Sequence, residues 1–417
     1  MSDLVSVMLE KIVHARPSMN LRISPAHAKN FLLTYHGLVG EPRFQGHEGI
    51  IGFVRQAGCI QFDPVDSCGR NADLVLQARI PDYRPSWLYN ELYDNRRLVD
   101  YFDKNMAIFS IEDWPYFERM RKYFRAHPRL TPTIRNACAE ILRQIADNGG
   151  VLTSQDADIP GKVDWSWAPT KLSRAALEAL YFQGDLIIHH KVGTIKHYAP
   201  TREHIPAEIL NVSEPHPHDG EYVAWHVKRR IGAVGMLWNR PSDAWLAIMG
   251  MSGETRKAAF SLLEQRGDII PVHIDGLKDV LYIRREDEPL LQTCITKKNE
   301  VRRLEFIAPL DNIMWDRRLI EAFFGFSYKW EIYTPQADRK YGWYVLPVLW
   351  NGEFIGRIEM TADRKQKVLA VKGFWPEKTF SSSGKDNRRQ FTAALEKRLE
   401  KFAAFNGCID VQHTARS

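Results

Sequence analysis

The sequence predicts a mainly α-helical chain with added β-structure, in which tandem winged-helix units precede a small β-rich C-terminal domain. Two segments share a helix-then-hairpin pattern, and from about Arg303 the pattern changes to short β-prone runs. The chain has 417 residues, which is more than a single core usually organises. We therefore expect an α+β protein made of several packed units.

The repeated pattern becomes visible when Leu177–Ile187 is aligned with Phe260–Ile270. Both segments read as a helix, a Gly-Asp pair and a strand, and the glycine suits the left-handed cap that ends many helices. Each strand returns as a hairpin, the first to Ile195–Tyr198 and the second to Val280–Ile283. Each copy is therefore predicted to be a helix followed by a β-hairpin.

Further helical patterns precede each copy. Pro132–Ala146 and a run from Ser154 onward precede the first, and Glu221–Ile231 and Pro241–Met249 precede the second. Three helices and a hairpin make a winged helix, whose third helix is free to lie in a DNA major groove. The same units also serve as protein-interaction modules, so the pattern alone does not decide the partner.

The N-terminal region predicts a third, degraded copy. Ala26–His36 and Gly46–Gln56 have helical patterns, Gly58 ends the second helix, and Cys59–Asp63 reads as a strand. The order of these elements differs from that in the other two copies. Ahead of them, Leu4–Val13 reads as a short amphipathic helix rather than an export signal.

The C-terminal part is predicted to be a separate β-rich unit with a closing helix. Asn351-Gly352 lies between two apolar runs and is a strong hairpin-turn signal, and Asp386–Phe405 carries one apolar stripe at helical spacing. The β-prone runs are Leu304–Ile307, Lys329–Tyr333, Trp343–Leu349, Phe354–Met360 and Val368–Phe374. We place the domain boundaries at residues 1–127, 128–212, 213–292 and 300–417.

Composition excludes several classes of protein. Hydrophobic residues make 44% and charged residues 26%, which argues against a fibrous, disordered or membrane-embedded chain. The net charge of +6 permits binding to a polyanion without demonstrating it. The five cysteines are widely spaced and form no Cys-x-x-Cys pair, which favours a reducing, cytoplasmic location.

The segment Ile60–Pro64 contains the sharpest chemical feature. Side chains on a strand alternate between its faces, so Gln61 and Asp63 share one face, and Pro64 ends the strand directly after the carboxylate. The pair would stand at a rim that a substrate can reach. The ordinary alternatives are a carboxylate that caps local backbone amides and a solvent-facing glutamine.

These residues resemble the AlkZ/YcaQ-like winged-helix DNA glycosylases, which excise alkylated bases and, in several members, unhook interstrand crosslinks. The triplet Gln61-Phe62-Asp63 is similar to the YcaQ branch, whereas the AlkZ branch carries a second glutamine. Other blocks that look like the family's are Arg70, Leu74–Arg79, Pro309–Arg317, Phe326–Tyr328, Glu331–Pro335, Tyr341–Pro347 and Gly356-Arg357. The resemblance covers most of the chain.

The resemblance implies a cofactor-independent, monofunctional glycosylase that hydrolyses the bond between deoxyribose and an N7-alkylated purine. An alkyl group on N7 makes the base cationic and a good leaving group, so the enzyme need not protonate it. Asp63 would stabilise the sugar cation and position water, and Gln61 would hold that water or the sugar. It also implies a concave DNA channel built from the winged helices.

The partner implied is double-stranded DNA with alkylated bases, bound by a monomer and without a membrane. Candidate phosphate contacts are Arg70 and Arg79 after the triplet, and Lys171 and Arg174 on the third helix of the middle unit. Such charges are also common on solvated faces. Two rival functions stay open: a non-catalytic DNA-binding protein or transcription regulator, and a protein-interaction scaffold.

One segment departs from the family's pattern. Many members have Glu-Tyr-Trp-x-His-Glu where this chain has Asp100–Asn105, so Lys104 stands in the place of the histidine. One interpretation is a side chain that is solvated or touches phosphate. The other is an amine that attacks the anomeric carbon of the sugar and gives lyase activity.

Metal and cofactor chemistry has no clear motif in the sequence. His189-His190 and His216-Pro-His218 lack a companion cluster at metal-ligand spacing. No phosphate-binding loop, dinucleotide fingerprint or Gly-x-Ser-x-Gly motif is present. We therefore expect neither a metal nor a cofactor.

Overall fold

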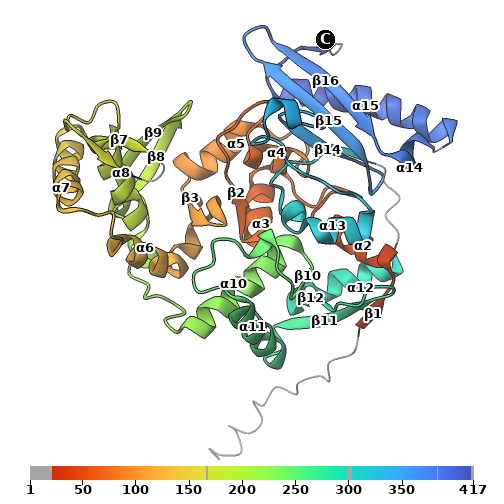
Figure 1. Ribbon diagram of the computed structural model, residues 1–417, viewed down its shortest axis with the longest axis horizontal. Helices are drawn as coiled ribbons and strands as arrows, with labels where there is room; N and C mark the ends of the chain where they lie inside the picture. Colours follow the sequence, from red (N-terminus) through yellow and green to blue (C-terminus); the bar gives the residue numbers. More distant parts are fainter. Residues whose placement is uncertain (1–20, 166–167, 298–302, 383, 415–417) are drawn as a thin grey trace, which may run out of the picture.

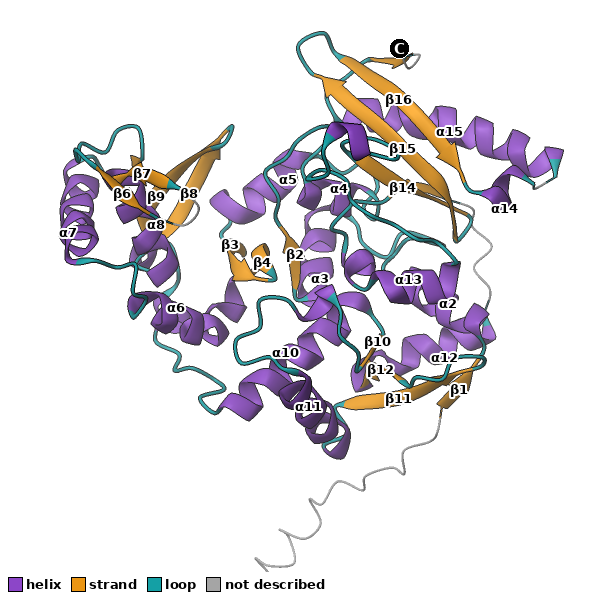
Figure 2. Ribbon diagram, viewed as in Figure 1, coloured by secondary structure: helices purple, strands orange, loops and turns teal. Residues whose placement is uncertain are grey.

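Helices and short sheets alternate along the chain in the computed structural model, which describes residues 21–165, 168–297, 303–382 and 384–414 (Figures 1 and 2). The predicted mixed α and β class is confirmed, and the arrangement is consistent with tandem winged-helix units. The domain boundaries stay predictions. The helix expected at Leu4–Val13 lies outside the described residues.

In the N-terminal region a pair of longer helices packs beside a three-stranded sheet. The helices are α2 (Pro25–Tyr35) and α3 (Gly46–Ala57), close to the predicted ranges. The strands are β2 (Cys59–Gln61), β3 (Leu98–Asp103) and β4 (Asn105–Ser110), in the order β2-β4-β3. Strand β2 ends two residues earlier than predicted, so Asp63 lies in the loop that follows it.

The middle unit contains α7 (Pro132–Asp147), α8 (Leu172–Gln183) and the hairpin β8 (Leu186–Val192) and β9 (Ile195–Pro200). Helix α8 ends as predicted, at Gly184 in the left-handed conformation with φ 83°. Strand β5 (Leu152–Thr153) pairs with β9, which gives the order β5-β9-β8. In Figure 1 this unit, in yellow, stands apart from the central elements.

The helix predicted from Ser154 onward is wrong. The hydroxyl of Thr153 accepts hydrogen bonds from the backbone amides of Gln155 and Asp156, which closes a turn instead of starting a helix. Pro160 and Gly161 then favour extended chain, and the segment continues into the paired strands β6 (Lys162–Asp164) and β7 (Pro169–Lys171).

The third unit contains α10 (Asp219–Val234), α11 (Gly253–Gln265) and the hairpin β11 (Ile269–Ile274) and β12 (Leu281–Arg284). This hairpin lies inside a four-stranded sheet, between β1 (Leu21–Ile23) on one side and β10 (Leu237–Trp238) on the other. The helix predicted at Pro241–Met249 is wrong, because only one 3-10 turn, Asp243–Trp245, forms before Ala247 adopts a positive φ of 63°.

The C-terminal unit is a five-stranded sheet with a long helix along it (Figure 1). The predicted turn at Asn351-Gly352 is confirmed, with φ angles of 50° and 83° that suit a tight hairpin. The predicted strand at Lys329–Tyr333 is wrong, because that segment pairs with no other strand. The elements are β13 (Leu304–Phe306), β14 (Val345–Trp350), β15 (Glu353–Asp363), β16 (Val368–Pro376), β17 (Asp410–His413) and α15 (Lys385–Phe405).

Shorter helices connect these units. They are α4 (Asn71–Gln77), α5 (Pro85–Tyr89), α6 (Glu118–Arg125), α9 (Ala207–Leu210), α12 (Glu288–Thr296), α13 (Arg317–Phe324) and α14 (Lys378–Ser381). Within the described ranges, no helix combines the length and the apolar character that crossing a bilayer requires.

Two large apolar cores meet at strand β2. Cys59 packs in the core that joins the N-terminal region to the middle and third units, where Phe31 and Phe109 also lie. Ile60 packs in the other core, which joins α3 and α4 to the C-terminal sheet. Because consecutive strand residues point to opposite faces, β2 is held between the two cores and Gln61 follows at their junction.

Candidate active site at the end of strand β2

Asp63 is a partly exposed carboxylate in the loop after β2. Its Oδ1 atom accepts a hydrogen bond from the backbone amide of Val65 at 2.9 Å, so the residue does open a turn. Its Oδ2 atom has no hydrogen-bond partner among the described residues. Burial raises the pKa of Asp63 above its usual value, and the Val65 amide offsets part of that rise.

Two buried asparagines hold strand β2 in place. Asn71, at the start of α4, donates to the Gln61 carbonyl at 2.7 Å and accepts from the Leu310 amide at 3.1 Å. Asn312 donates to the Cys59 carbonyl at 2.9 Å. The loop that begins at Pro309 therefore fixes the backbone from which Gln61 and Asp63 project. Sequence reasoning missed both asparagines, and the only available signal was the family-like block that contains Asn312.

Lys104 lies directly against the Gln61 side chain. It occupies the turn between β3 and β4, is 4% exposed, and its Nζ atom donates to Gln61 Oε1 at 3.0 Å. The indole ring of Trp315 lies 4.9 Å from the amine. The amine has no ion pair with a described carboxylate. Lys104 is therefore neither solvated nor free to reach a phosphate in this structure, contrary to the first of the two interpretations above.

The surroundings of Lys104 disfavour its charged form. Burial, followed by the nearby guanidinium of Arg230, lowers the pKa of Lys104 from 10.5 to about 8. The ammonium has donors only, so the Gln61 atom that faces it is the carbonyl oxygen. The Gln61 Nε2 atom is left without a partner among the residues that the structure describes, and is available to another acceptor.

Helix α10 of the third unit clamps the turn that carries Lys104. Arg229 Nε contacts Asp103 Oδ2 at 2.7 Å, and Arg230 Nη1 contacts Asp103 Oδ1 at 2.5 Å. Arg229 also donates to the Gly58 carbonyl at 2.7 Å, just before β2. Although burial alone raises the pKa of Asp103, the guanidiniums of Arg230 and Arg229 hold it well below its usual value.

Three basic side chains lie close to the loop around Asp63, one from the chain just before α4 and two from hairpins. Arg70 donates to the Gly193 carbonyl at the tip of the β8–β9 hairpin, at 3.3 Å, and its side chain is about one third exposed. Lys191 of the same hairpin forms an ion pair with Asp100, and its amine lies 4.0 Å from the Phe62 ring. From the β15–β16 turn, Arg364 pairs with Asp66 at 2.7 Å.

The predicted phosphate contacts on the middle unit are accessible. Lys171 is exposed at the start of α8, and the exposed Arg174 one turn later pairs with Glu178 at 3.0 Å. Together with Arg70 they remain candidates for DNA contacts. On the matching helix α11, Lys257 is exposed, whereas Arg256 is buried and donates to Asn239 Oδ1 at 2.8 Å.

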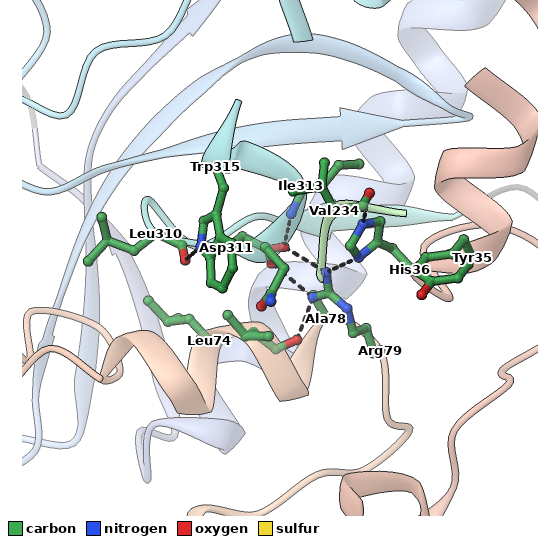
Figure 3. Close-up of polar contacts among 12 residues, drawn as sticks. Tyr35, His36, Leu74, Ala78, Arg79, Val234, Leu310, Asp311, Ile313 and Trp315 are labelled. Atoms are coloured by element: carbon green, nitrogen blue, oxygen red, sulfur yellow. Dashed lines mark hydrogen bonds and ion pairs between the residues drawn. The ribbon is translucent and has the colours of Figure 1, made fainter. Parts of the chain in front are cut away.

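Arg79 does not fit its predicted role as a phosphate contact. Its side chain is fully enclosed and donates to both carboxylate oxygens of Asp311, at 2.7 and 2.8 Å (Figure 3). It also donates to the Val75 carbonyl and lies 3.4 Å from His36 Nδ1. A guanidinium that is paired in this way and shielded from solvent holds the fold together, so we leave Arg79 out of the DNA contacts.

The histidines of the middle unit have more neighbours than the sequence indicated. The rings of His190 and His197 stack at 4.0 Å, and His189 lies 5.0 Å from His190 and 4.9 Å from His204. Within the described ranges, however, no three His, Cys, Asp or Glu side chains are placed to hold a metal ion. The five cysteines are all buried as free thiols.

Comparisons with known proteins agree with this architecture. The fold is similar to that of the DNA glycosylase AlkZ from Streptomyces sahachiroi, with a TM-score of 0.60 over 95% of this chain and 100% of that one. The two sequences are 14% identical, a level at which the likeness shows the fold alone. Residues 54–405 match the model of the family described as DNA glycosylase AlkZ-like. The chain therefore belongs to the AlkZ-like DNA glycosylase family.

Proposed function

We propose that this protein hydrolyses the N-glycosidic bond of N7-alkylated purines in double-stranded DNA. The observation that carries the proposal is the Asp63 carboxylate, which is partly exposed, anchored through one oxygen and open at the other. Water is the nucleophile for base excision in this proposal, as in the monofunctional mechanism that the family resemblance implies. Family membership supports a glycosylase, and the lesion and the roles of single residues are our inference.

The chemistry requires little from the protein at the base itself. Alkylation at N7 leaves a positive charge on the purine, so the base departs without an acid. The remaining barrier is the positive charge that develops on the sugar, together with the capture of the sugar by water. The free Oδ2 of Asp63 stabilises that charge and takes a proton from the water, and its raised pKa improves it as a base.

Gln61 assists through its amide nitrogen. Because Lys104 holds the carbonyl oxygen of the side chain, the two N–H bonds on Nε2 point away from the lysine. They would donate to the attacking water or to a sugar oxygen. This arrangement gives Gln61 one orientation before the substrate binds, which lowers the cost of ordering it in the transition state.

The DNA backbone would contact exposed basic residues of the N-terminal region and the middle unit. Arg70, Lys171 and Arg174 are the proposed phosphate contacts, and the β8–β9 hairpin lies against the loop of the motif. We extend the proposal to a monomer that acts in the cytoplasm, where five free cysteines stay reduced.

Bulky and crosslinked guanines fall within the proposed substrates. A base tethered to the opposite strand cannot enter a closed pocket in the way that most excised bases do. Asp63 is partly exposed, and a cavity of about 870 Å³ between α15 and the segment Ile80–Pro85 is lined by other residues. An open carboxylate of this kind suits a base that stays in the duplex.

The test uses duplex DNA that contains N7-methylguanine, followed by alkali to cleave abasic sites. We expect strand scission by the natural protein and a loss of about 10²- to 10⁴-fold in the single-turnover rate for Asp63→Asn, with binding retained. Asp66→Asn is the matched control, because that carboxylate is occupied by Arg70 and Arg364.

The outcomes separate the functions. Binding without scission by the natural protein would identify a non-catalytic DNA-binding protein. An equal loss in Asp63→Asn and Asp66→Asn would mean that the loop, rather than the Asp63 carboxylate, is required.

A further inference from the structure

Lys104 has the surroundings of a reactive amine. Most buried lysines are neutralised by a carboxylate, as Lys191 is by Asp100. Lys104 has no such partner among the described residues, and its contacts are an amide oxygen and an indole ring. Burial and the nearby Arg230 guanidinium both favour the uncharged form. A desolvated lysine beside another cation is a recurrent way to activate an amine as a nucleophile.

The position of Lys104 ties this amine to the reaction site. Its Nζ atom is one hydrogen bond, 3.0 Å, from the Gln61 side chain, and Gln61 is two residues from Asp63. The two ion pairs from α10 to Asp103 fix the backbone of the turn next to it. A deoxyribose held by the Gln61 amide would therefore lie next to Lys104, whose amine would leave its contact with Gln61 Oε1 to reach C1′.

We propose that Lys104 gives the protein a second activity, in which its amine forms an imine with C1′ of an abasic deoxyribose and cleaves the DNA strand by β-elimination. The inference rests on the proposed function for its natural substrate, because the abasic site is the product of base excision. Excision itself stays hydrolytic, and the lysine acts only on the opened sugar that remains.

The reaction balances without an oxidant or a reductant. The lone pair of neutral Nζ attacks the C1′ aldehyde carbon, and after addition of one proton the carbonyl oxygen leaves as water, which gives a protonated imine. The Asp63 carboxylate takes a proton from C2′. The electron pair of that C–H bond forms the C2′–C3′ double bond, and the C3′–O bond breaks, so that the downstream strand leaves with its 5′-phosphate. Water then hydrolyses the imine and restores the amine.

The experiment is borohydride trapping on duplex DNA with a preformed abasic site. Borohydride reduces the imine to a stable amine, so a covalent complex of the full chain and DNA is expected on a denaturing gel. We expect Lys104→Met and Lys104→Arg each to form at least tenfold less adduct, because neither side chain forms an imine under these conditions. Arginine keeps a cationic donor for Gln61, which guards against a simple collapse of the site.

Lys196 supplies the matched control. It lies on β9, burial lowers its pKa as well, and it pairs with no described carboxylate, but its amine faces the Tyr181 ring at 5.5 Å rather than Gln61. Lys196→Met is expected to keep the adduct. Peptide mapping of the natural adduct should place the modification on Lys104, a result that does not depend on how well any variant folds.

The pH dependence provides a further check. With a pKa of about 8, the neutral fraction of Lys104 rises about fivefold between pH 7 and pH 8, and the rate of trapping should follow it. No adduct with the natural protein, an adduct that survives Lys104→Met, or a modification mapped to another amine would overturn the proposal.

The result is independent of the excision assay. Excision of N7-methylguanine without trapping would remove the lyase and leave the proposed function. Trapping on preformed abasic DNA without excision would do the reverse.

Discussion

The two helix–hairpin units share one sequence pattern but differ in what covers their hairpins. The β8–β9 hairpin belongs to a three-stranded sheet, and its tip contacts Arg70 beside the motif. The β11–β12 hairpin has β1 along one edge and β10 along the other, inside a four-stranded sheet. The first hairpin thus keeps β8 as an edge strand next to the motif, whereas the second is flanked by strands on both edges.

The third unit, which contains the β11–β12 hairpin, contacts the site through helix α10 instead. Arg229 and Arg230 of α10 hold Asp103, which precedes Lys104, and Arg229 also contacts the Gly58 carbonyl before β2. The third unit therefore holds the backbone before β2 and the turn next to Lys104 through buried contacts, whereas the middle unit contacts the loop of the motif through its hairpin. The difference shows that a repeated local pattern does not carry a repeated role, because the partners outside the repeat decide it.

The largest expected effect tests the buried support. Asp103→Asn leaves Arg230 enclosed without a carboxylate and leaves Arg229 with Asp113 alone, so we expect a loss of about 3–5 kcal/mol in the free energy of unfolding by urea. Asp100→Asn removes the ion-pair partner of Lys191, which belongs to the middle unit. Its loss should be smaller, because a flexible lysine can move its amine toward solvent. Equal losses would contradict the distinction between the two units.

An intermediate effect concerns pH. His226 on α10 is fully enclosed, and neither ring nitrogen has a hydrogen-bond partner among the described residues. Burial lowers its pKa well below its usual value of 6.5, so below about pH 6.5 the unfolded chain binds a proton that the native state does not. The free energy of unfolding is therefore higher at neutral pH than in acid, because only the unfolded chain gains this proton as the pH falls.

His226→Phe should therefore flatten the acid-side decline in the free energy of unfolding between pH 7 and pH 5. It should also add about 1–3 kcal/mol at pH 7, because an unsatisfied polar group is removed while the ring contacts remain. His190→Phe, on the middle unit, is the variant with which this slope is compared. That ring is partly exposed, so its effect on the decline should be smaller. An unchanged slope in His226→Phe would refute the assignment.

The smallest expected effect concerns the affinity for DNA, to which the middle and third units should contribute differently. The double variant Lys171→Ala/Arg174→Ala should weaken binding to all duplex sequences and reduce the salt slope of log Kd by about 1 for each lost phosphate contact. Lys257→Ala, on the matching helix α11, should leave the slope unchanged. Fluorescence anisotropy between about 50 and 200 mM salt measures both. A slope that falls equally in both would mean that the two units contact DNA alike.

The sequence predicted the elements whose signals are local. The helix that ends at Gly184 and the turn at Asn351-Gly352 were found because left-handed backbone favours glycine and asparagine wherever it occurs. The predicted helices from Ser154 and at Pro241–Met249 were wrong. Apolar spacing suggested a helix, but side-chain turns and proline prevailed over it.

The candidate site was predicted only in part. The sequence predicted that Gln61 and Asp63 share one face of a strand, but β2 ends at Gln61 and Asp63 lies in the loop that follows it. Asn71 and Asn312 hold strand β2 through hydrogen bonds, and Asn312 lies 253 positions from its partner Cys59 in the sequence. Lys104 is buried against Gln61. No periodicity in a single sequence reports such contacts, because they depend on how the units pack.

Arg70 and Arg79 show which properties the sequence sets and which the tertiary structure sets. The sequence by itself determined that helix α8 ends at Gly184 and that a hairpin turns at Asn351-Gly352, since backbone preferences belong to each residue and its neighbours. Only the tertiary structure decided that Arg79 is enclosed against Asp311 while Arg70 stays partly exposed beside Asp66 and the β8–β9 hairpin. The reason is that the burial and pairing of a charge are set by distant segments that pack around it.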